Sequence, residues 1–203
     1  MSILFEHVIR NDIKQVKVEL SHSSLKKHVK ASCIVYAAAL GHVEMVDMLL
    51  KKGIPFNTFD VLSDFTRTWE SRLLKKLQKK IETDMKLYTR GWSPILTPAC
   101  VAAFYGHIGV IEVLITHMKD LSEMQFDPYS QSARVYLWDN MPSMNALTCA
   151  FFGQKWHIVR MLLTLGVVPT GMTEQYPHFV QFGTQIPDEI IVIIFSYLTN
   201  SDL

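Results

Sequence analysis

A block of about fourteen residues occurs three times along this chain, and it constrains the fold more than any other feature. The copies at residues 37–50 and 102–115 align without a gap, and a third runs from Cys149 to Leu163. A weaker fourth copy runs from Val8 to Leu20. Recurrence of this kind is typical of solenoids, in which each unit buries its apolar faces only by stacking against its neighbours.

Each copy has the pattern of two short helices joined by a turn. Small residues such as Ala37 and Ala38 let the first helix approach its neighbour closely. Gly41, Gly106 and Gly153 are expected to end the first helices in a backbone conformation that side chains disfavour. Apolar residues then recur at helical spacing in the second helix, as at Val43, Val46, Leu49 and Leu50. The sequence therefore predicts an all-α, helix-turn-helix repeat solenoid.

These repeats resemble the ankyrin repeat family, whose units carry Thr-Pro-Leu-His before two alanines and Gly-His after them. The closest match is Thr97-Pro98-Ala99-Cys100 with Gly106-His107, and Ser32 and Met144 align with the threonine. The resemblance implies ankyrin repeats over residues 1–170, with units at about 2–31, 32–55, 93–120 and 140–170. Residues 56–92 are either a degenerate repeat or a basic helical insertion.

Within residues 56–92, the pattern between Asp64 and Tyr88 predicts a long amphipathic helix. Its apolar residues recur every four positions, at Phe65, Trp69, Leu73, Leu77, Ile81 and Met85. Basic residues lie largely off that stripe, at Arg72, Lys75, Lys76, Lys79 and Lys80. The basic side could meet an acidic protein, a phosphate-bearing lipid or nucleic acid, and it could equally be a solvated face that binds nothing.

The C-terminal residues differ in character from the repeats. Residues 171–185 are predicted to be a linker, and residues 186–203 begin a helix with Pro187 and two acidic residues, which favour a helix start. This segment resembles the opening of an F-box. The resemblance implies docking on the Skp adaptor of a cullin-RING ubiquitin ligase through Ile186, Pro187, Ile190, Ile191, Ile194, Phe195 and Leu198. The alternative is that the helix caps the open end of the solenoid.

In each ankyrin repeat, the last two residues of the first helix face the concave side of the solenoid, where partners bind. Here those residues are Ala39-Leu40, Phe104-Tyr105 and Phe151-Phe152. The predicted target-binding patch consists of Phe104, Tyr105, Phe151, Phe152, Trp92 and Trp138. The alternative is that the inserted segments fold over these rings and cover them.

The sequence predicts no catalytic residue, no cofactor and no metal site. Cys33, Cys100 and Cys149 are each followed by a histidine, but the spacings differ and none gives the paired ligands of a zinc site. With 20 basic and 19 acidic residues, the chain lacks the overall charge of a nucleic-acid or membrane-surface protein. We also expect no membrane span or signal peptide, and reduced, buried thiols.

These patterns together predict a non-catalytic adaptor of the cytoplasm, with the nucleus as a second compartment. Its ankyrin repeats would recruit a target protein, and its F-box-like end would bring the target to the ligase. Similar combinations of ankyrin repeats with shortened F-box-like ends occur in a group of poxvirus proteins, which suggests a host-virus interaction. The alternative function is an ankyrin scaffold or inhibitor whose C-terminal helix is only a cap.

Overall fold

The computed structural model describes residues 2–22, 27–54, 60–61, 72–86, 95–118, 145–165, 167 and 187. These residues form four helix pairs, one further helix and one short strand pair, so the predicted all-α class is confirmed for them. The helix pairs are α1 (Ser2–Ile9) with α2 (Ile13–His22), α3 (Lys27–Ala39) with α4 (Val43–Lys51), α7 (Pro98–Tyr105) with α8 (Ile108–His117), and α10 (Ala146–Phe152) with α11 (Trp156–Thr164). The other elements are α6 (Arg72–Lys86), β1 (Asp60–Val61) and β2 (Ile95–Leu96).

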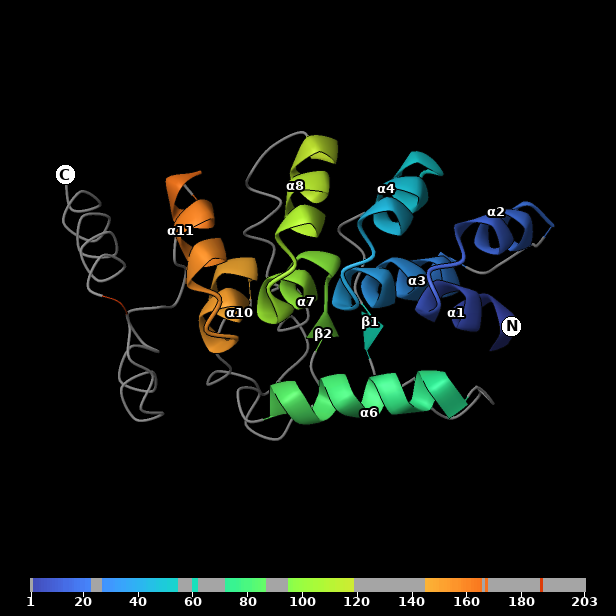
Figure 1. Cartoon of the computed structure of the whole chain (residues 1–203), viewed down its shortest axis with the longest axis horizontal. Coiled ribbons are helices and arrows are strands. Elements are labelled where there is room, and N and C mark those ends of the chain that lie inside the picture. The colour runs from blue at the N-terminus through green and yellow to red at the C-terminus, as the bar shows by residue number, and fades with distance from the viewer. Residues whose placement is uncertain are drawn as a thin grey trace, which may run out of the picture.

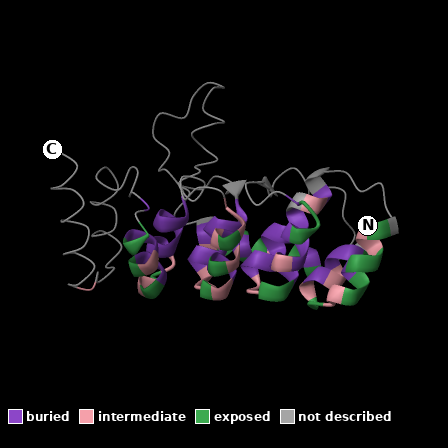
Figure 2. Cartoon of the chain, turned by 90° about the horizontal axis from the view of Figure 1, so that it is seen from above, coloured by how far each residue is buried: buried purple, intermediate pink, exposed green. Residues whose placement is uncertain are grey.

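The four helix pairs stand side by side along the long axis of the molecule (Figure 1). Their first helices, α1, α3, α7 and α10, form one layer, and their second helices form the other. In the first layer α3 packs against α1 and α7, and α7 packs against α10. Figure 2 views this row from above and shows buried residues in every pair. The core is therefore one continuous strip that runs along the row between neighbouring pairs.

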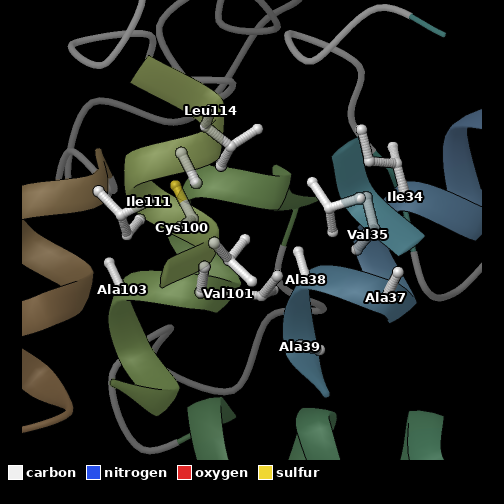
Figure 3. Close-up of a cluster of buried hydrophobic side chains, with 14 of the residues drawn as sticks. Ile34, Val35, Ala37, Ala38, Ala39, Cys100, Val101, Ala103, Ile111 and Leu114 are labelled. Carbon is white, nitrogen blue, oxygen red and sulfur yellow. The ribbon is translucent and has the colours of Figure 1, made fainter. Parts of the chain in front are cut away.

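Small side chains line the contacts between the first helices. Ala37 and Ala38 of α3 and Val101 and Ala103 of α7 are all fully buried and belong to one cluster (Figure 3). Ala150 on α10 is buried in the same way. Because alanine extends only a methyl group from the backbone, neighbouring helices can pack closely and gain dispersion contacts along their length.

One turn geometry joins the two helices of every pair. The N–H group before the second helix donates to a carbonyl five residues earlier, in the pairs Asp12 to His7 (2.8 Å), His42 to Ala37 (2.9 Å), His107 to Ala102 (2.9 Å) and Lys155 to Ala150 (2.9 Å). The residue before each donor is left-handed, namely Asn11, Gly41, Gly106 and Gln154. The four helix pairs are therefore structural repeats of one another.

This shared turn corrects the alignment of the third recognised copy by one residue. Gly153 has an ordinary φ of −75°, and the left-handed residue is Gln154 with φ 55°. The prediction that Gly153 adopts a conformation disfavoured by side chains was wrong. Likewise Asn145, and not Met144, occupies the position that Thr97 has in its repeat. Its side chain accepts a hydrogen bond from the Thr148 N–H at 2.9 Å, as Thr97 does from Cys100 at 3.1 Å.

Gly153 is required for a different reason, which is the close approach of α10 to α7. A Cβ atom at this position would lie far inside contact distance of the Phe104 carbonyl oxygen. The obstacle is backbone, which cannot rotate away as a flexible side chain can. Glycine therefore permits the packing of the two helices, and the strain of the left-handed turn falls on Gln154.

Histidine side chains connect the turns to the preceding helix pair. Nε2 of His42 donates to the carbonyl of Ile9 at 3.2 Å, and Nε2 of His107 donates to the carbonyl of Ala39 at 3.0 Å. Ile9 and Ala39 occupy equivalent positions, so the two contacts are repeats of each other. Burial lowers the pKa of His107. The hydrogen bond to the Ala39 carbonyl opposes this shift, and the charges of His42 and Lys155 add to it.

Residues 60–61 and 72–86 do not form a helix pair in the row. β1 and β2 pair antiparallel, with Asp60 opposite Leu96 and Val61 opposite Ile95. The segment that contains α6 therefore begins and ends at neighbouring positions beside the row of helix pairs. Between them α6 runs along the long axis, across the layer of first helices (Figure 1). The predicted helix between Asp64 and Tyr88 is thus present over residues 72–86.

The buried side of α6 differs from the predicted apolar stripe. Its fully buried apolar residues are Leu74, Ile81 and Met85, whereas Leu73 is 39% exposed and Leu77 is half-buried. A spacing of four residues drifts by about 40° per step around a helix of 3.6 residues per turn, so the predicted stripe does not stay on one face. The predicted positions Phe65 and Trp69 lie outside the described residues.

The contact at Gly153 predicts a large effect of a small substitution. Gly153→Ala should reduce the free energy of unfolding by more than about 2 kcal/mol, because the added methyl group forces α10 away from α7. Gly53→Ala is the matched control, since Gly53 has φ 79° but open space around its Cβ position. The control should cost about 1 kcal/mol from backbone strain alone. Equal losses of the two variants in urea unfolding would contradict the close contact.

His107 predicts a pH-dependent stability. Its lowered pKa means that the folded state favours the neutral ring, so this contribution is complete above the unfolded pKa of about 6.5 and is lost as the pH falls through the folded pKa. The loss has a limiting slope of about 1.4 kcal/mol per pH unit. His107→Gln keeps a donor for Ala39 but cannot titrate, so urea unfolding between pH 7 and 5 should show a shallower dependence. An identical slope for both proteins would exclude His107 as the cause.

Candidate protein-binding surface

The predicted aromatic patch is mostly buried. Phe104, Phe151 and Phe152 are 8%, 1% and 7% exposed, and only Tyr105 is half-buried. The corrected register explains Phe151, which occupies the position of the buried Ala38 and not a concave-side position. The three phenylalanine rings therefore offer little surface to a partner, which disagrees with their predicted role. The alternative that inserted segments fold over these rings stays a prediction. Trp92 and Trp138 lie outside the described residues.

Tyr105 on α7 is held by α6. Its hydroxyl group donates to Oδ2 of Asp84 at 2.9 Å, and Nζ of Lys80 lies 5.2 Å from the centre of its ring. The Phe104 ring also meets the Tyr105 ring edge to face, with centroids 5.2 Å apart. Burial raises the pKa of the Tyr105 phenol, and the hydrogen bond to Asp84 and its negative charge raise it further. Tyr105 is thus a neutral donor in the contact between α6 and α7.

A second polar contact joins α6 to α3. The amide Nε2 of Gln78 donates to the hydroxyl oxygen of Tyr36 at 2.7 Å, and both side chains are buried. Oε1 of Gln78 is buried and makes no hydrogen bond among the described residues. An unpaired buried oxygen costs about 1–3 kcal/mol, so Gln78 adds specificity to this contact more than stability.

Apolar contacts complete the attachment of α6. Leu74, Ile81 and Met85 are fully buried and share one side of the helix with Gln78, at a spacing that follows the helical turn. This is the pattern by which an amphipathic helix lies in a groove of another protein. Here α6 packs against the chain's own repeats, so it occupies the side of the row on which Tyr36 and Tyr105 lie.

The outward side of α6 is positively charged. We define the α6 basic face as the exposed residues Arg72, Lys75, Lys76, Lys79 and Lys80. Lys80 lies 3.8 Å from Asp84 and also over the Tyr105 ring. The pattern of basic residues was visible in the sequence, but its attachment to Tyr36 and Tyr105 was not, because those contacts join residues far apart in the chain.

Six of the seven predicted ligase-docking residues lie outside the described residues. Pro187 is partly buried and is the only one of the seven among the described residues. Ile186, Ile190, Ile191, Ile194, Phe195 and Leu198 lie outside them. Docking through this segment therefore stays a prediction.

The cysteine and histidine side chains serve packing and the turns. Cys33, Cys100 and Cys149 are buried and form no disulfide, and the rings of His42 and His107 donate to backbone carbonyls. Within the described ranges, no three His, Cys, Asp or Glu side chains come together as a metal site would require. In the same ranges, no helix has the length and apolar character needed to cross a bilayer.

Comparison with known proteins adds no assignment. No family model, curated protein or solved structure matches this chain. The repeated turns, the helix α6 and its basic face are therefore the observations on which a function is argued.

Because these phenylalanine rings are buried, we expect them to contribute to the stability of the fold. Phe152→Ala should reduce the free energy of unfolding by about 3–5 kcal/mol, because it leaves a cavity in the core. Ile108→Ala is the matched control, since Ile108 begins α8 and is 41% exposed, and it should cost less than about 1 kcal/mol. Urea unfolding followed by circular dichroism measures both. A stable Phe152→Ala variant that loses a bound target would restore the predicted patch.

Proposed function

We propose that this protein is a non-catalytic adaptor built on ankyrin-type repeats. Its repeats recruit a target protein, and its F-box-like residues 186–203 dock on the Skp adaptor of a cullin-RING ubiquitin ligase. The observation that carries the first half is the row of four helix pairs with one shared turn. The proposed compartments are the cytoplasm and the nucleus.

The row supports a binding function because of how solenoids are built. Each unit contacts only its neighbours, so the structure extends in one direction and presents a long surface on each side. In this chain the small buried residues and the histidine contacts between pairs fix the spacing of the units. Side chains on successive units are thereby held at set distances, which favours recognition of another protein.

Ligase docking is supported by the sequence of the last eighteen residues. Ile186-Pro187-Asp188-Glu189 resembles the start of an F-box, and the apolar residues after it recur at the spacing of a helix that binds in a groove. The alternative is a scaffold or inhibitor in which the same apolar side caps the helical row. Both alternatives need an apolar helix, but only docking requires a partner.

Binding to purified Skp adaptor and cullin tests the ligase half of the proposal. The tagged full chain should retain both proteins, and Pro187→Ala with Ile191→Ala should abolish retention with little change in melting temperature. Val192→Ala with Ile193→Ala is the matched control, because these residues of the same segment lie outside the predicted contact set. It should retain the adaptor.

The capping alternative predicts the opposite pattern. A chain that retains neither purified protein, combined with a lower melting temperature for Pro187→Ala with Ile191→Ala, would replace ligase docking with a cap on the helical row.

A further inference from the structure

We propose that the α6 basic face is a docking surface for an acidic, extended segment of the target protein. This inference rests on the target-binding half of the proposed function and not on ligase docking. It commits to a protein partner whose carboxylates alternate along an extended chain.

Positive charge is concentrated in α6 and is not spread over the chain. α6 contains six basic and two acidic residues, whereas the rest of the chain contains fourteen basic and seventeen acidic residues. The near-neutral total thus combines a positive helix with a weakly negative remainder. An acidic partner would be drawn to α6 in preference to other parts of the surface.

The order of charges over residues 72–80 of α6 opposes helix stability. Like charges stand four residues apart in the pairs Arg72–Lys76, Lys75–Lys79 and Lys76–Lys80, and such neighbours repel each other. The first turn contains no acidic residue, so Arg72 and Lys75 also face the positive end of the helix dipole. A helix that needed only solubility would be better served by alternating signs. The pattern therefore points to a role outside folding.

Four of the five cations lack an acidic partner in the described part of the chain. Two other lysines are paired: Nζ of Lys51 lies 2.6 Å from Oδ2 of Asp47, and Nζ of Lys80 lies 3.8 Å from Oδ2 of Asp84. Arg72, Lys75, Lys76 and Lys79 are exposed, and within the described ranges no carboxylate lies within 4.0 Å of them. Their charges remain available to a partner.

The spacing of the cations fits an extended peptide. Residues four apart on a helix advance about 6 Å along its axis, as from Arg72 to Lys76 and on to Lys80. In an extended chain, side chains on the same side are about 6.5–7 Å apart. Carboxylates at alternate positions of such a chain can therefore lie opposite Arg72, Lys76 and Lys80. Lys75 and Lys79 form a parallel row. Leu73, exposed beside the first row, offers an apolar contact.

A membrane or a nucleic acid fits less well. An amphipathic helix binds a bilayer by inserting its apolar side, but the apolar side of α6 is buried in the protein at Leu74, Ile81 and Met85. Single-stranded nucleic acids are bound by aromatic side chains that stack on the bases, and α6 contains no aromatic residue. An acidic protein segment needs only the charges and a small apolar contact.

Fluorescence anisotropy with the full chain and a labelled probe tests the proposal. The probe is a peptide of about eight residues in which Glu alternates with Ser. Replacement of Arg72, Lys75, Lys76 and Lys79 by Gln should weaken its binding by about tenfold or more, and binding to the unchanged chain should weaken as salt is raised. The control variant replaces Lys14, Lys17, Lys52 and Arg160 by Gln, which are exposed cations outside α6. It loses the same net charge and should bind within about twofold of the unchanged chain.

Three results would overturn the proposal. These are no binding of the acidic peptide, equal weakening in both variants, and tighter α6-dependent binding of an oligonucleotide or of phosphatidylserine vesicles than of the peptide. The melting temperature separates loss of binding from loss of fold. It should stay equal or rise in the α6 variant, because the repulsion between neighbouring cations is removed.

Ligase docking is measured separately on the same variants. The α6 variant should still retain purified Skp adaptor, whereas Pro187→Ala with Ile191→Ala should still bind the acidic peptide. Failure of the basic face and failure of ligase docking therefore give different results.

Discussion

Close packing between successive first helices is the constraint on which the rest of the structure depends. A pair of short helices cannot bury its apolar faces alone, so each pair must lie against the next. Alanines at the contacts and Gly153 beside the Phe104 carbonyl allow that approach. Because one turn recurs in all four pairs, every pair enters the row in the same orientation. The histidine contacts from His42 and His107 then join the second and third turns to the pair before each of them.

The helix α6 changes what this row presents to a partner. In a simple solenoid the residues before the turns would be available, but here α6 lies over the first helices and binds Tyr36 and Tyr105. Its apolar residues Leu74, Ile81 and Met85 are buried, and two polar contacts join it to α3 and α7. The protein consequently offers the outer side of a helix where the repeats themselves would otherwise be exposed. Within the described ranges, four of the five cations of that side have no acidic partner, which supports the proposal of an acidic partner.

The two halves of the proposed function rest on different residues. The proposed target binding rests on the row and on the contacts of α6. The proposed ligase docking rests on the resemblance of residues 186–203 to an F-box. A substitution of charged residues in α6 changes none of the apolar residues in the C-terminal segment, and the reverse is equally true. The two proposals can therefore be tested independently.

The sequence by itself determined the helix pairs, their turns and the charge pattern of α6, because these depend on local periodicity and on residues close together in the chain. It misplaced the third turn, since matching Gly153 to Gly41 and Gly106 is the natural alignment, whereas Gln154 takes the left-handed conformation. It also placed Leu73 on the buried side of α6. Only the tertiary structure decided that Gly153 serves a contact with Phe104, that three phenylalanine rings are buried, and that Tyr105 meets Asp84. Those outcomes depend on distances between residues far apart in the chain, which no local pattern encodes.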